Sequence, residues 1–372
     1  MKIGITCYPT YGGSGIVATE LGVELSARGH EVHFITYANP IRLTKDLPRI
    51  HYHEVEVSNY PLFQYPPYSL ALASRMADVA QTEGLDLLHV HYAIPHSISA
   101  YLASQMFDGK LPFVTTLHGT DVTLVGTDPS FLPITRFSIA RSPGITSISE
   151  YLKRRTIEVF GAGQEMRVIP NFVNCEFYRP EPNADVRARY AHADEAVLIH
   201  LSNFRPVKRI RDCVRVMAKV NPAIPSRLLM VGDGPERAQA HALAKELGIE
   251  DRVIFLGKQL DVAPLLAIAD LMLLPSEMEG FGLAALEAMA CGVPAIASDV
   301  GGLPEVVDHD QNGFLLPVGD IDAMAEAALS VLGDPARKKA LGAAARETAL
   351  TRFSADKIIP QYEQYYRDVC GG

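Results

Sequence analysis

Two glutamates that flank a glycine turn form the most informative pattern in this 372-residue sequence. Glu279 directly precedes the turn Gly280-Phe281-Gly282-Leu283, and Glu287 follows in a stretch of helical pattern that ends at Gly292. Free amides at the start of a helix favour a phosphate group. The order of groups therefore suits a nucleoside diphosphate sugar, with Glu279 on the sugar hydroxyls, the amides on the diphosphate and Glu287 on the ribose. Two solvated helix glutamates are the alternative interpretation.

Three cations follow a predicted strand over residues 196–201, namely Arg205, Lys208 and Arg209. Such a cluster is often only solvated, but this one is expected at the carboxyl end of a parallel strand, where ligands bind in open α/β folds. Arg205 and Lys208 there would stabilise a diphosphate that gains charge as it leaves. Gly232 begins another glycine turn in the same layer and is a further candidate for donor binding.

A glycine loop also follows the first predicted strand, and it opens a helix at Gly13-Ser14-Gly15. Bare amides at that position favour an anion. The segment fits the dinucleotide pattern GxGxxA, but the second predicted strand ends in Thr36-Tyr37, with no carboxylate to hold a ribose. The pattern therefore argues against an NAD or FAD enzyme.

The composition excludes several classes of protein. Hydrophobic residues make up 48% of the chain and the formal net charge is −9, which argues against disorder and against a nucleic-acid binder. The five cysteines are widely spaced with no CxxC pair, so neither a disulfide framework nor a metal site is expected, and a reducing cytoplasm fits best. No signal peptide or membrane span is predicted. The oligomeric state stays open, with a homo-oligomer possible.

Short β-branched runs alternate with helical patterns along the whole chain, which indicates α/β architecture with parallel sheets. We predict two doubly wound, Rossmann-like domains that face a central cleft, over residues 1–168 and 169–352. A final helix over residues 353–372 is expected to pack back on the first domain. The predicted strands are residues 2–7, 31–36, 87–91, 113–117, 144–147, 196–201, 227–231, 253–256, 271–275 and 295–298.

These motifs, together with Val300-Gly301-Gly302-Leu303-Pro304-Glu305, resemble the retaining family 4 glycosyltransferases of the GT-B fold over nearly the whole chain. Further segments are similar to the branch of that family that acts in bacillithiol biosynthesis. They are residues 4–9, 63–68, 89–96, 116–121 and 202–205.

The resemblance implies transfer of N-acetylglucosamine from UDP-N-acetylglucosamine to the hydroxyl of L-malate, with retention at the anomeric carbon and without a metal or other cofactor. The residues agree with the last point, because no DxD-type pair stands at a strand end. Family resemblance favours front-face attack, in which the departing phosphate oxygen accepts the acceptor's proton. The same donor with another acceptor, such as an inositol phosphate, and a UDP-sugar epimerase are the alternatives.

In the first domain, His118 stands at the end of a predicted strand, where it would face the donor sugar as a catalytic candidate, although a strand-end capping role is the alternative. Gly13 is assigned to the donor. A malate acceptor has two carboxylates, so its pocket needs donors or cations. The candidates are Ser14, Gly15, Arg42, Tyr92 and Thr120, with Arg136 as an alternative to Arg42.

Overall fold

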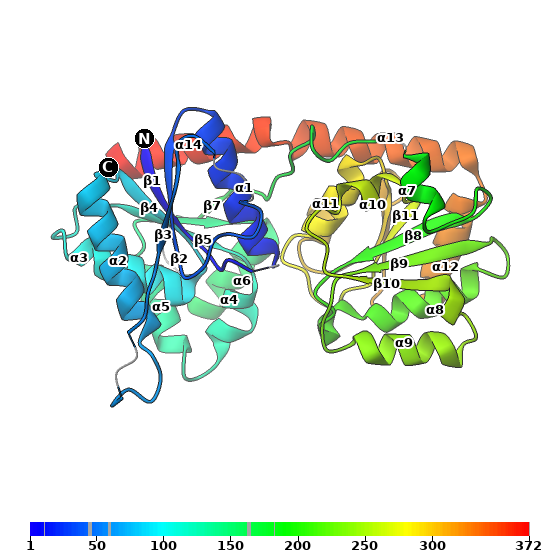
Figure 1. The fold of residues 1–372 in the computed structure, drawn as a ribbon, viewed down its shortest axis with the longest axis horizontal. Coiled ribbons are helices and arrows are strands. Elements are labelled where there is room, and N and C mark those ends of the chain that lie inside the picture. Colours follow the sequence, from blue (N-terminus) through cyan, green and yellow to red (C-terminus); the bar gives the residue numbers. More distant parts are fainter. Residues whose placement is uncertain (11, 44–46, 59–60, 162–164, 182, 372) are drawn as a thin grey trace. The chain divides into compact units, whose positions relative to one another are not determined.

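The computed structural model describes residues 1–10, 12–43, 47–58, 61–161, 165–181 and 183–371. The chain divides into two compact units (Figure 1). Unit 1 holds Met1–Asn171 and Ile358–Gly372, and unit 2 holds Phe172–Lys357. The division thus falls between Asn171 and Phe172, three residues after the boundary expected from the sequence.

Unit 1 is built on a parallel sheet in the order β3-β2-β1-β4-β5-β6-β7. Its strands are β1 (Lys2–Thr6), β2 (Glu31–Thr36), β3 (Ile50–Glu54), β4 (Leu87–His91), β5 (Phe113–Leu117), β6 (Gly144–Ser147) and β7 (Arg167–Val168). Its helices are α1 (Gly13–Ala27), α2 (Tyr68–Glu83), α3 (Ile98–Gln105), α4 (Thr120–Thr123), α5 (Leu132–Arg141), α6 (Glu150–Phe160) and nearly all of α14 (Ala355–Gly371).

Unit 2 repeats the plan with a parallel sheet in the order β10-β9-β8-β11-β12-β13. Its strands are β8 (Ala196–Leu201), β9 (Ser226–Val231), β10 (Val253–Gly257), β11 (Leu271–Leu274), β12 (Ala295–Ser298) and β13 (Gly313–Leu316). Its helices are α7 (Ala184–Ala188), α8 (Ile210–Val220), α9 (Arg237–Glu246), α10 (Ala263–Ala267), α11 (Leu283–Ala290), α12 (Ile321–Leu332) and α13 (Pro335–Arg352).

Both sheets are doubly wound, so the prediction of two Rossmann-like α/β domains is confirmed. The central strands β4, β5 and β11 are buried at every residue, although β4 and β5 carry histidine and threonine side chains among the apolar ones. In unit 2, helices α8, α9 and α12 pack together, and α11 packs with α13 (Figure 1). The strand order reverses between β1 and β4 in unit 1 and between β8 and β11 in unit 2. These reversals are the positions where open α/β sheets hold ligands at the carboxyl ends of their strands.

The last helix, α14, packs on unit 1 through tyrosine hydroxyls. Tyr365 accepts a hydrogen bond from the amide of Ile145 at 2.8 Å and donates to the carbonyl of the same residue at 3.0 Å. The hydroxyl of Tyr366 lies 2.8 Å from Nδ1 of His89, in the buried centre of the sheet. The buried tyrosines therefore contribute directed hydrogen bonds in addition to apolar packing.

Strands β3, β7 and β13 were not predicted from the sequence. Strand β3 reads Ile-His-Tyr-His-Glu and lies at the sheet edge, where its half-exposed polar side chains hide the apolar alternation of a strand. Strand β7 contains only two residues. These omissions concern the sheet edges and leave the ligand-binding reversals unchanged.

Candidate active site

The loop after β8 is held by a buried histidine. One nitrogen of His200, Nδ1, lies 2.8 Å from the carbonyl of Leu273 on β11, and the other, Nε2, lies 2.7 Å from Oγ of Ser202. Burial lowers the pKa of His200 to about 4, so the ring is neutral at pH 7. Ser202 in turn accepts the amide hydrogen of Phe204. The loop that carries the candidate cations is therefore fixed to the central strands.

The glycine turn after β9 allows the β8 loop to approach closely. A Cβ atom on Gly232 would lie 1.8 Å from the carbonyl oxygen of Ser202, and one on Gly234 would lie 2.2 Å from that of Asn203. The amide of Gly232 donates to the carbonyl of Gly257 at 2.8 Å. The amide of Gly232, a donor-binding candidate, is therefore already hydrogen-bonded. Because Gly232 has no side chain, the β8 loop that carries the cations can pack against it.

Two predicted residues, Lys208 and Glu279, form an ion pair with each other. Nζ of Lys208 lies 2.5 Å from Oε1 of Glu279, and both side chains are mostly buried. Oγ of Ser276 donates to the same oxygen at 3.0 Å. This arrangement fixes the carboxylate and leaves Oε2 as the oxygen for further hydrogen bonds.

The other two cations of the cluster differ from each other. Arg209 binds Asp212 at 2.6 Å and Glu277 at 2.7 Å, and these hydrogen bonds raise its pKa. Arg205 is exposed and makes no ion pair within the described part of the chain. Arg205 is therefore the member of the cluster with an unengaged guanidinium.

The Glu279 turn is formed against a second glycine loop, which the sequence analysis quoted without a role. The amide of Gly302 donates to the carbonyl of Glu279 at 3.0 Å, and a Cβ on Gly301 would lie 1.9 Å from that carbonyl oxygen. Gly282 has a φ of 103°, which favours glycine, and it starts helix α11. The turn thus directs the first amides of α11, including that of Leu283, away from the helix.

Phe281 and Glu287 are more deeply buried than the sequence suggests. The ring of Phe281 is buried and packs edge-on against Phe353 with centroids 5.5 Å apart, so this side chain fixes the turn to the core of unit 2. Glu287 is only 4% exposed and accepts a hydrogen bond of 2.8 Å from the hydroxyl of Tyr178. Tyr178 orients this carboxylate, and no local sequence pattern connects the two residues.

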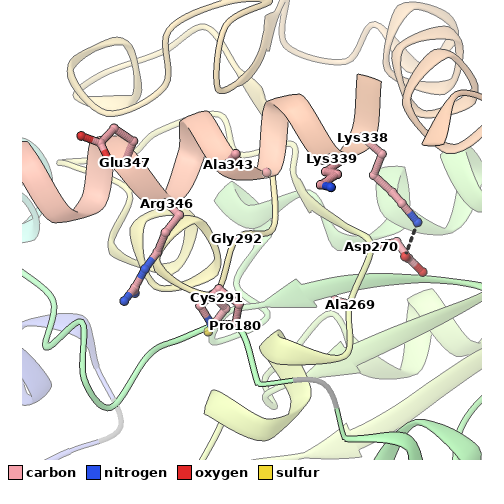
Figure 2. Close-up of a pocket in the computed structure, with 11 residues that line it drawn as sticks. Pro180, Ala269, Asp270, Cys291, Gly292, Lys338, Lys339, Ala343, Arg346 and Glu347 are labelled. Carbon is pink, nitrogen blue, oxygen red and sulfur yellow. Dashed lines mark hydrogen bonds and ion pairs between the residues drawn. The ribbon is translucent and has the colours of Figure 1, made fainter. Parts of the chain in front are cut away.

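A surface pocket of about 470 Å³ lies elsewhere in unit 2, along α13 (Figure 2). Three of its charged groups already serve the fold: Lys338 pairs with Asp270 at 2.7 Å, and Arg346 donates to three backbone carbonyls. None of the predicted site residues lines this pocket.

In unit 1, the start of α1 lies against the loop after β1. Gly15 is buried, and a Cβ on it would lie 2.3 Å from the carbonyl oxygen of Tyr8. Gly13 is exposed at the first turn, and Oγ of Ser14 donates to the hydroxyl of Tyr92 at 3.3 Å. The structure thus brings the acceptor candidates Ser14 and Tyr92 together.

His118 belongs to a stack of neutral rings at the ends of β4 and β5. Its ring stacks on Tyr92 at 5.5 Å and on His91 at 5.0 Å. Nε2 of His118 lies 2.8 Å from Nδ1 of His91, so Nδ1 is the ring nitrogen of His118 that could contact a ligand. Burial lowers the pKa of His118 to about 3 and places that of His91 well below its usual value. Both imidazoles are therefore neutral at pH 7, and His91 sets the orientation of His118.

Asp121 holds the backbone of this region. Its carboxylate accepts hydrogen bonds from the amides of Ala93, His118 and Gly119 at 2.9 to 3.1 Å. Burial raises its pKa, against the opposing effect of these bonds. The adjacent Thr120 begins the short helix α4 and is partly exposed.

Arg42 lies beside α1, where its guanidinium contacts Glu20 at 3.1 Å. Both side chains are partly buried, so this ion pair positions the arginine. Arg136, the alternative, is exposed on α5. Three partners were not predicted from the sequence, namely His91, Ser276 and Tyr178, because the fold brings each of them to its site residue.

The two sheets and their loops are those of a glycosyltransferase. Residues 11–177 match the family model "Glycosyltransferase Family 4", and residues 183–348 match "Glycosyl transferases group 1". The chain belongs to this glycosyltransferase family. Among the described residues, no helix is both long and apolar enough to cross a membrane.

One relative shares far more than the family pattern. The chain is 51% identical over 370 residues to N-acetyl-alpha-D-glucosaminyl L-malate synthase of Bacillus anthracis, which covers 99% of this chain and 97% of the relative. A GDP-mannose-dependent alpha-(1-6)-phosphatidylinositol monomannoside mannosyltransferase of Mycolicibacterium smegmatis is 29% identical over 80% of this chain and 81% of its own. A sucrose-phosphate synthase from Thermosynechococcus elongatus superimposes with a TM-score of 0.83 at 27% identity, over 100% of this chain and 99% of its own.

Proposed function

We propose that this glycosyltransferase moves N-acetylglucosamine from UDP-N-acetylglucosamine to the hydroxyl of L-malate, with retention at the anomeric carbon and without a metal in the transfer step. The observation that carries the proposal is the 51% identity, over 99% of the chain, to a relative named for the product of this reaction. A place in the cytoplasm, at the first step of bacillithiol biosynthesis, goes with it.

Unit 2 binds the donor in this proposal. The amides of Gly280 to Leu283 and the start of α11 bind the diphosphate, and the buried Glu287 accepts hydrogen bonds from the ribose. Glu279 uses Oε2 for hydroxyls of the sugar while Lys208 and Ser276 hold Oε1.

The transfer itself forms one bond and breaks one. The malate hydroxyl oxygen bonds to the anomeric carbon as the bond from that carbon to the β-phosphate oxygen breaks. The hydroxyl proton passes to the departing phosphate oxygen, so no protein base is needed and UDP leaves from the face that malate enters. Arg205 and Lys208 stabilise the negative charge that develops on the phosphate. His118, held by His91, donates or accepts a hydrogen bond through Nδ1 at a sugar hydroxyl.

Unit 1 binds the acceptor. Malate carries two carboxylates at pH 7 and requires hydrogen-bond donors or cations for both. The start of α1, with Ser14 and the amide of Gly15, takes one carboxylate, and Arg42 takes the other. Tyr92 and Thr120 contribute hydroxyls beside them. The Glu20 contact supports this role because it fixes the position of Arg42.

The experiment measures UDP release from UDP-N-acetylglucosamine with L-malate, with an inositol phosphate and with no acceptor, each with and without EDTA. We expect release that requires malate, a product with the α-configuration by NMR, and no loss of rate with EDTA. Release with the inositol phosphate alone would transfer the proposal to another acceptor. Conversion of the UDP-sugar without UDP release would instead identify an epimerase.

A further inference from the structure

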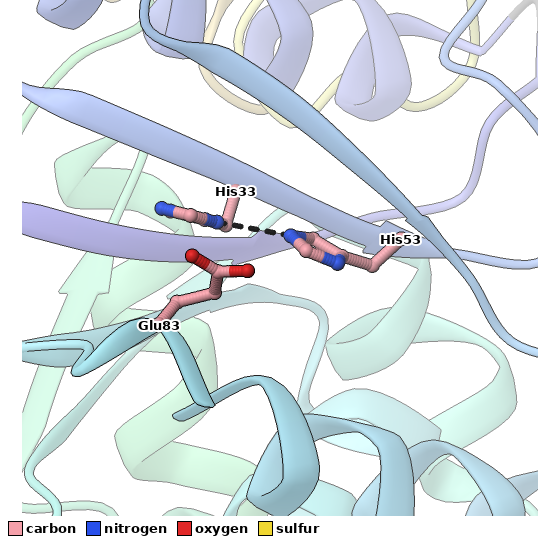
Figure 3. Close-up of side chains that lie close together, drawn as sticks. All are labelled: His33, His53 and Glu83. Carbon is pink, nitrogen blue, oxygen red and sulfur yellow. Dashed lines mark hydrogen bonds between the residues drawn. The ribbon is translucent and has the colours of Figure 1, made fainter. Parts of the chain in front are cut away.

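Two histidines and a glutamate from three separate elements meet on one face of the unit 1 sheet (Figure 3). They are His33 on β2, His53 on β3 and Glu83, the last residue of α2. One nitrogen of each imidazole and one carboxylate oxygen all lie within 4.8 Å of one another. None of these residues takes part in the proposed glycosyl transfer.

The register of the sheet creates this convergence. Strands β2 and β3 are parallel, with His33 opposite His51 and Ile35 opposite His53. Alternate residues of a strand share a face, so His33, His51 and His53 lie on the same side of the sheet. The ring of His33 stacks on that of His51 at 4.6 Å and on that of His53 at 5.2 Å. Helix α2 covers this face, and its end brings Glu83 to the two rings.

The two imidazoles face each other as neutral groups. Nδ1 of His33 and Nε2 of His53 are 2.9 Å apart. Burial lowers the pKa of His33 to about 4, and burial, followed by Arg75, lowers the pKa of His53. Neutral rings keep the lone pairs that a metal ligand needs. The Glu83 carboxylate makes no hydrogen bond or ion pair in the described contacts, so its charge is available.

We propose that His33, His53 and Glu83 bind a divalent cation of the zinc class, with water in the open position. Two imidazole nitrogens and one carboxylate oxygen form a ligand set that zinc prefers. Two nitrogens bound to one tetrahedral zinc lie about 3.3 Å apart. The pair in the structure is therefore close to the required spacing and needs to open by only a few tenths of an ångström.

The position of the site indicates a structural role. Strand β3 is the edge of the sheet and pairs only with β2. A cation held by β2, β3 and α2 would tie that edge strand to the helix above it. Binding to the folded state alone raises stability by mass action.

The test titrates the full-length protein, as a Cys370→Ser variant, with Co²⁺ and with Zn²⁺ in separate experiments. The substitution removes Cys370, the exposed thiol among the described cysteines, so that a surface thiolate cannot bind the added metal. Calorimetry gives the stoichiometry, Co²⁺ absorption reports nitrogen and oxygen ligands without thiolate, and thermal unfolding reports stabilisation. We expect one equivalent of metal, tetrahedral Co²⁺ bands in the visible range and a higher unfolding midpoint.

Matched variants locate the binding. His53→Ala and Glu83→Gln change partly exposed side chains and should each weaken binding by roughly tenfold or more, because even indirect partners of a metal contribute that much. His51→Ala removes the ring that stacks on His33 but lies outside the ligand set, and it should bind as tightly as its parent. The proposal is overturned if the protein takes up no metal, or if His53→Ala and Glu83→Gln bind as tightly as His51→Ala.

Discussion

The loops at the carboxyl ends of the two sheets differ in charge: those of unit 1 carry mainly neutral rings around His118, and those of unit 2 carry ion pairs around Glu279. Around His118, unit 1 gathers tyrosine and imidazole rings, and burial lowers the pKa values of His118 and His91 so that both imidazoles are neutral at pH 7. Around Glu279, unit 2 gathers ion pairs, with Lys208 and Arg209 held by carboxylates. A diphosphate requires charge compensation, whereas a sugar hydroxyl requires only a hydrogen bond. The contrast supports the proposal that the leaving group binds in unit 2 and that His118, in unit 1, contacts a neutral hydroxyl of the sugar.

The largest expected effect on this comparison is that of acidification, which should destabilise unit 1 more than unit 2. In unit 1, His89 and His96 are fully buried, with pKa values lowered to about 3 and about 4, and the described part of unit 2 has one such histidine, His200, at about 4. Below pH 6.5 these histidines are protonated in the unfolded chain but stay neutral in the folded protein, so the unfolded state binds more protons. Stability therefore falls as the pH drops from 6.5 towards 4, by up to about 1.4 kcal/mol per pH unit for each such histidine.

Hydrogen exchange of backbone amides at pH 7, 6 and 5, corrected for intrinsic rates, checks this prediction. Protection in β4 and β5 should decrease before protection in β8 and β11. Earlier loss in β8 and β11, or simultaneous loss in both sheets, would contradict it.

The charged side of the comparison predicts a large kinetic effect in unit 2. Arg205→Ala and Lys208→Ala should each lower kcat by roughly 10² to 10³-fold, because each removes a cation that stabilises the transition-state charge. Lys208→Ala should be the more severe of the two, since it also releases Glu279.

Arg211→Ala provides the matched control for these variants. This arginine lies on helix α8 of the same unit, is about half exposed and contacts Glu236, the residue before α9, at 3.3 Å. Its kcat should stay within about twofold of the parent, as expected for an exposed ion pair. A near-normal kcat for Arg205→Ala would remove Arg205 from the mechanism.

The neutral side of the comparison predicts a smaller effect for His118. Because the pKa of His118 is lowered to about 3, the ring stays neutral from pH 6 to 8 and contributes only a hydrogen bond. His118→Ala should lower kcat/KM for UDP-N-acetylglucosamine by about tenfold, the cost of leaving one polar partner unsatisfied. The pH profile of the parent enzyme should show no inflection from this residue. An inflection near pH 6.5 that disappears in His118→Ala would show that the imidazolium acts instead.

The sequence predicted those parts of the site that are contiguous motifs, but not the contacts between residues that the fold brings together. The turn from Glu279 to Leu283 and the cations from Arg205 to Arg209 were found because each is a contiguous motif after a strand. That Lys208 binds Glu279 was not predicted, since the two residues are on different loops and both were assigned directly to the substrate. Tyr178 and His91 carry no motif of their own, so only the packed structure reveals that they orient Glu287 and His118.

The same reason explains why the fold was easier to predict than its edges. A buried parallel strand such as β11, Leu-Met-Leu-Leu, is a continuous apolar run, which sequence patterns identify directly. Strand β3 is half exposed and rich in histidine, so its sequence indicates neither a strand nor the cluster formed with Glu83. Histidines 20 residues apart, as His33 and His53 are, become neighbours only through the parallel pairing of β2 with β3.

The smallest expected effect separates two arginines, one in each unit, by the substrate whose KM each one changes. Arg42 is assigned to a malate carboxylate in unit 1 and Arg205 to the departing phosphate in unit 2. Arg42→Ala should raise KM for malate by about tenfold, since it removes one charge-assisted hydrogen bond, and leave KM for the UDP-sugar and kcat nearly unchanged. Glu20→Gln, which keeps Arg42 but weakens its anchor, should raise KM for malate less. Equal increases in KM for both substrates in Arg42→Ala would mean that this arginine does not distinguish them, and that the start of α1 binds malate with another partner.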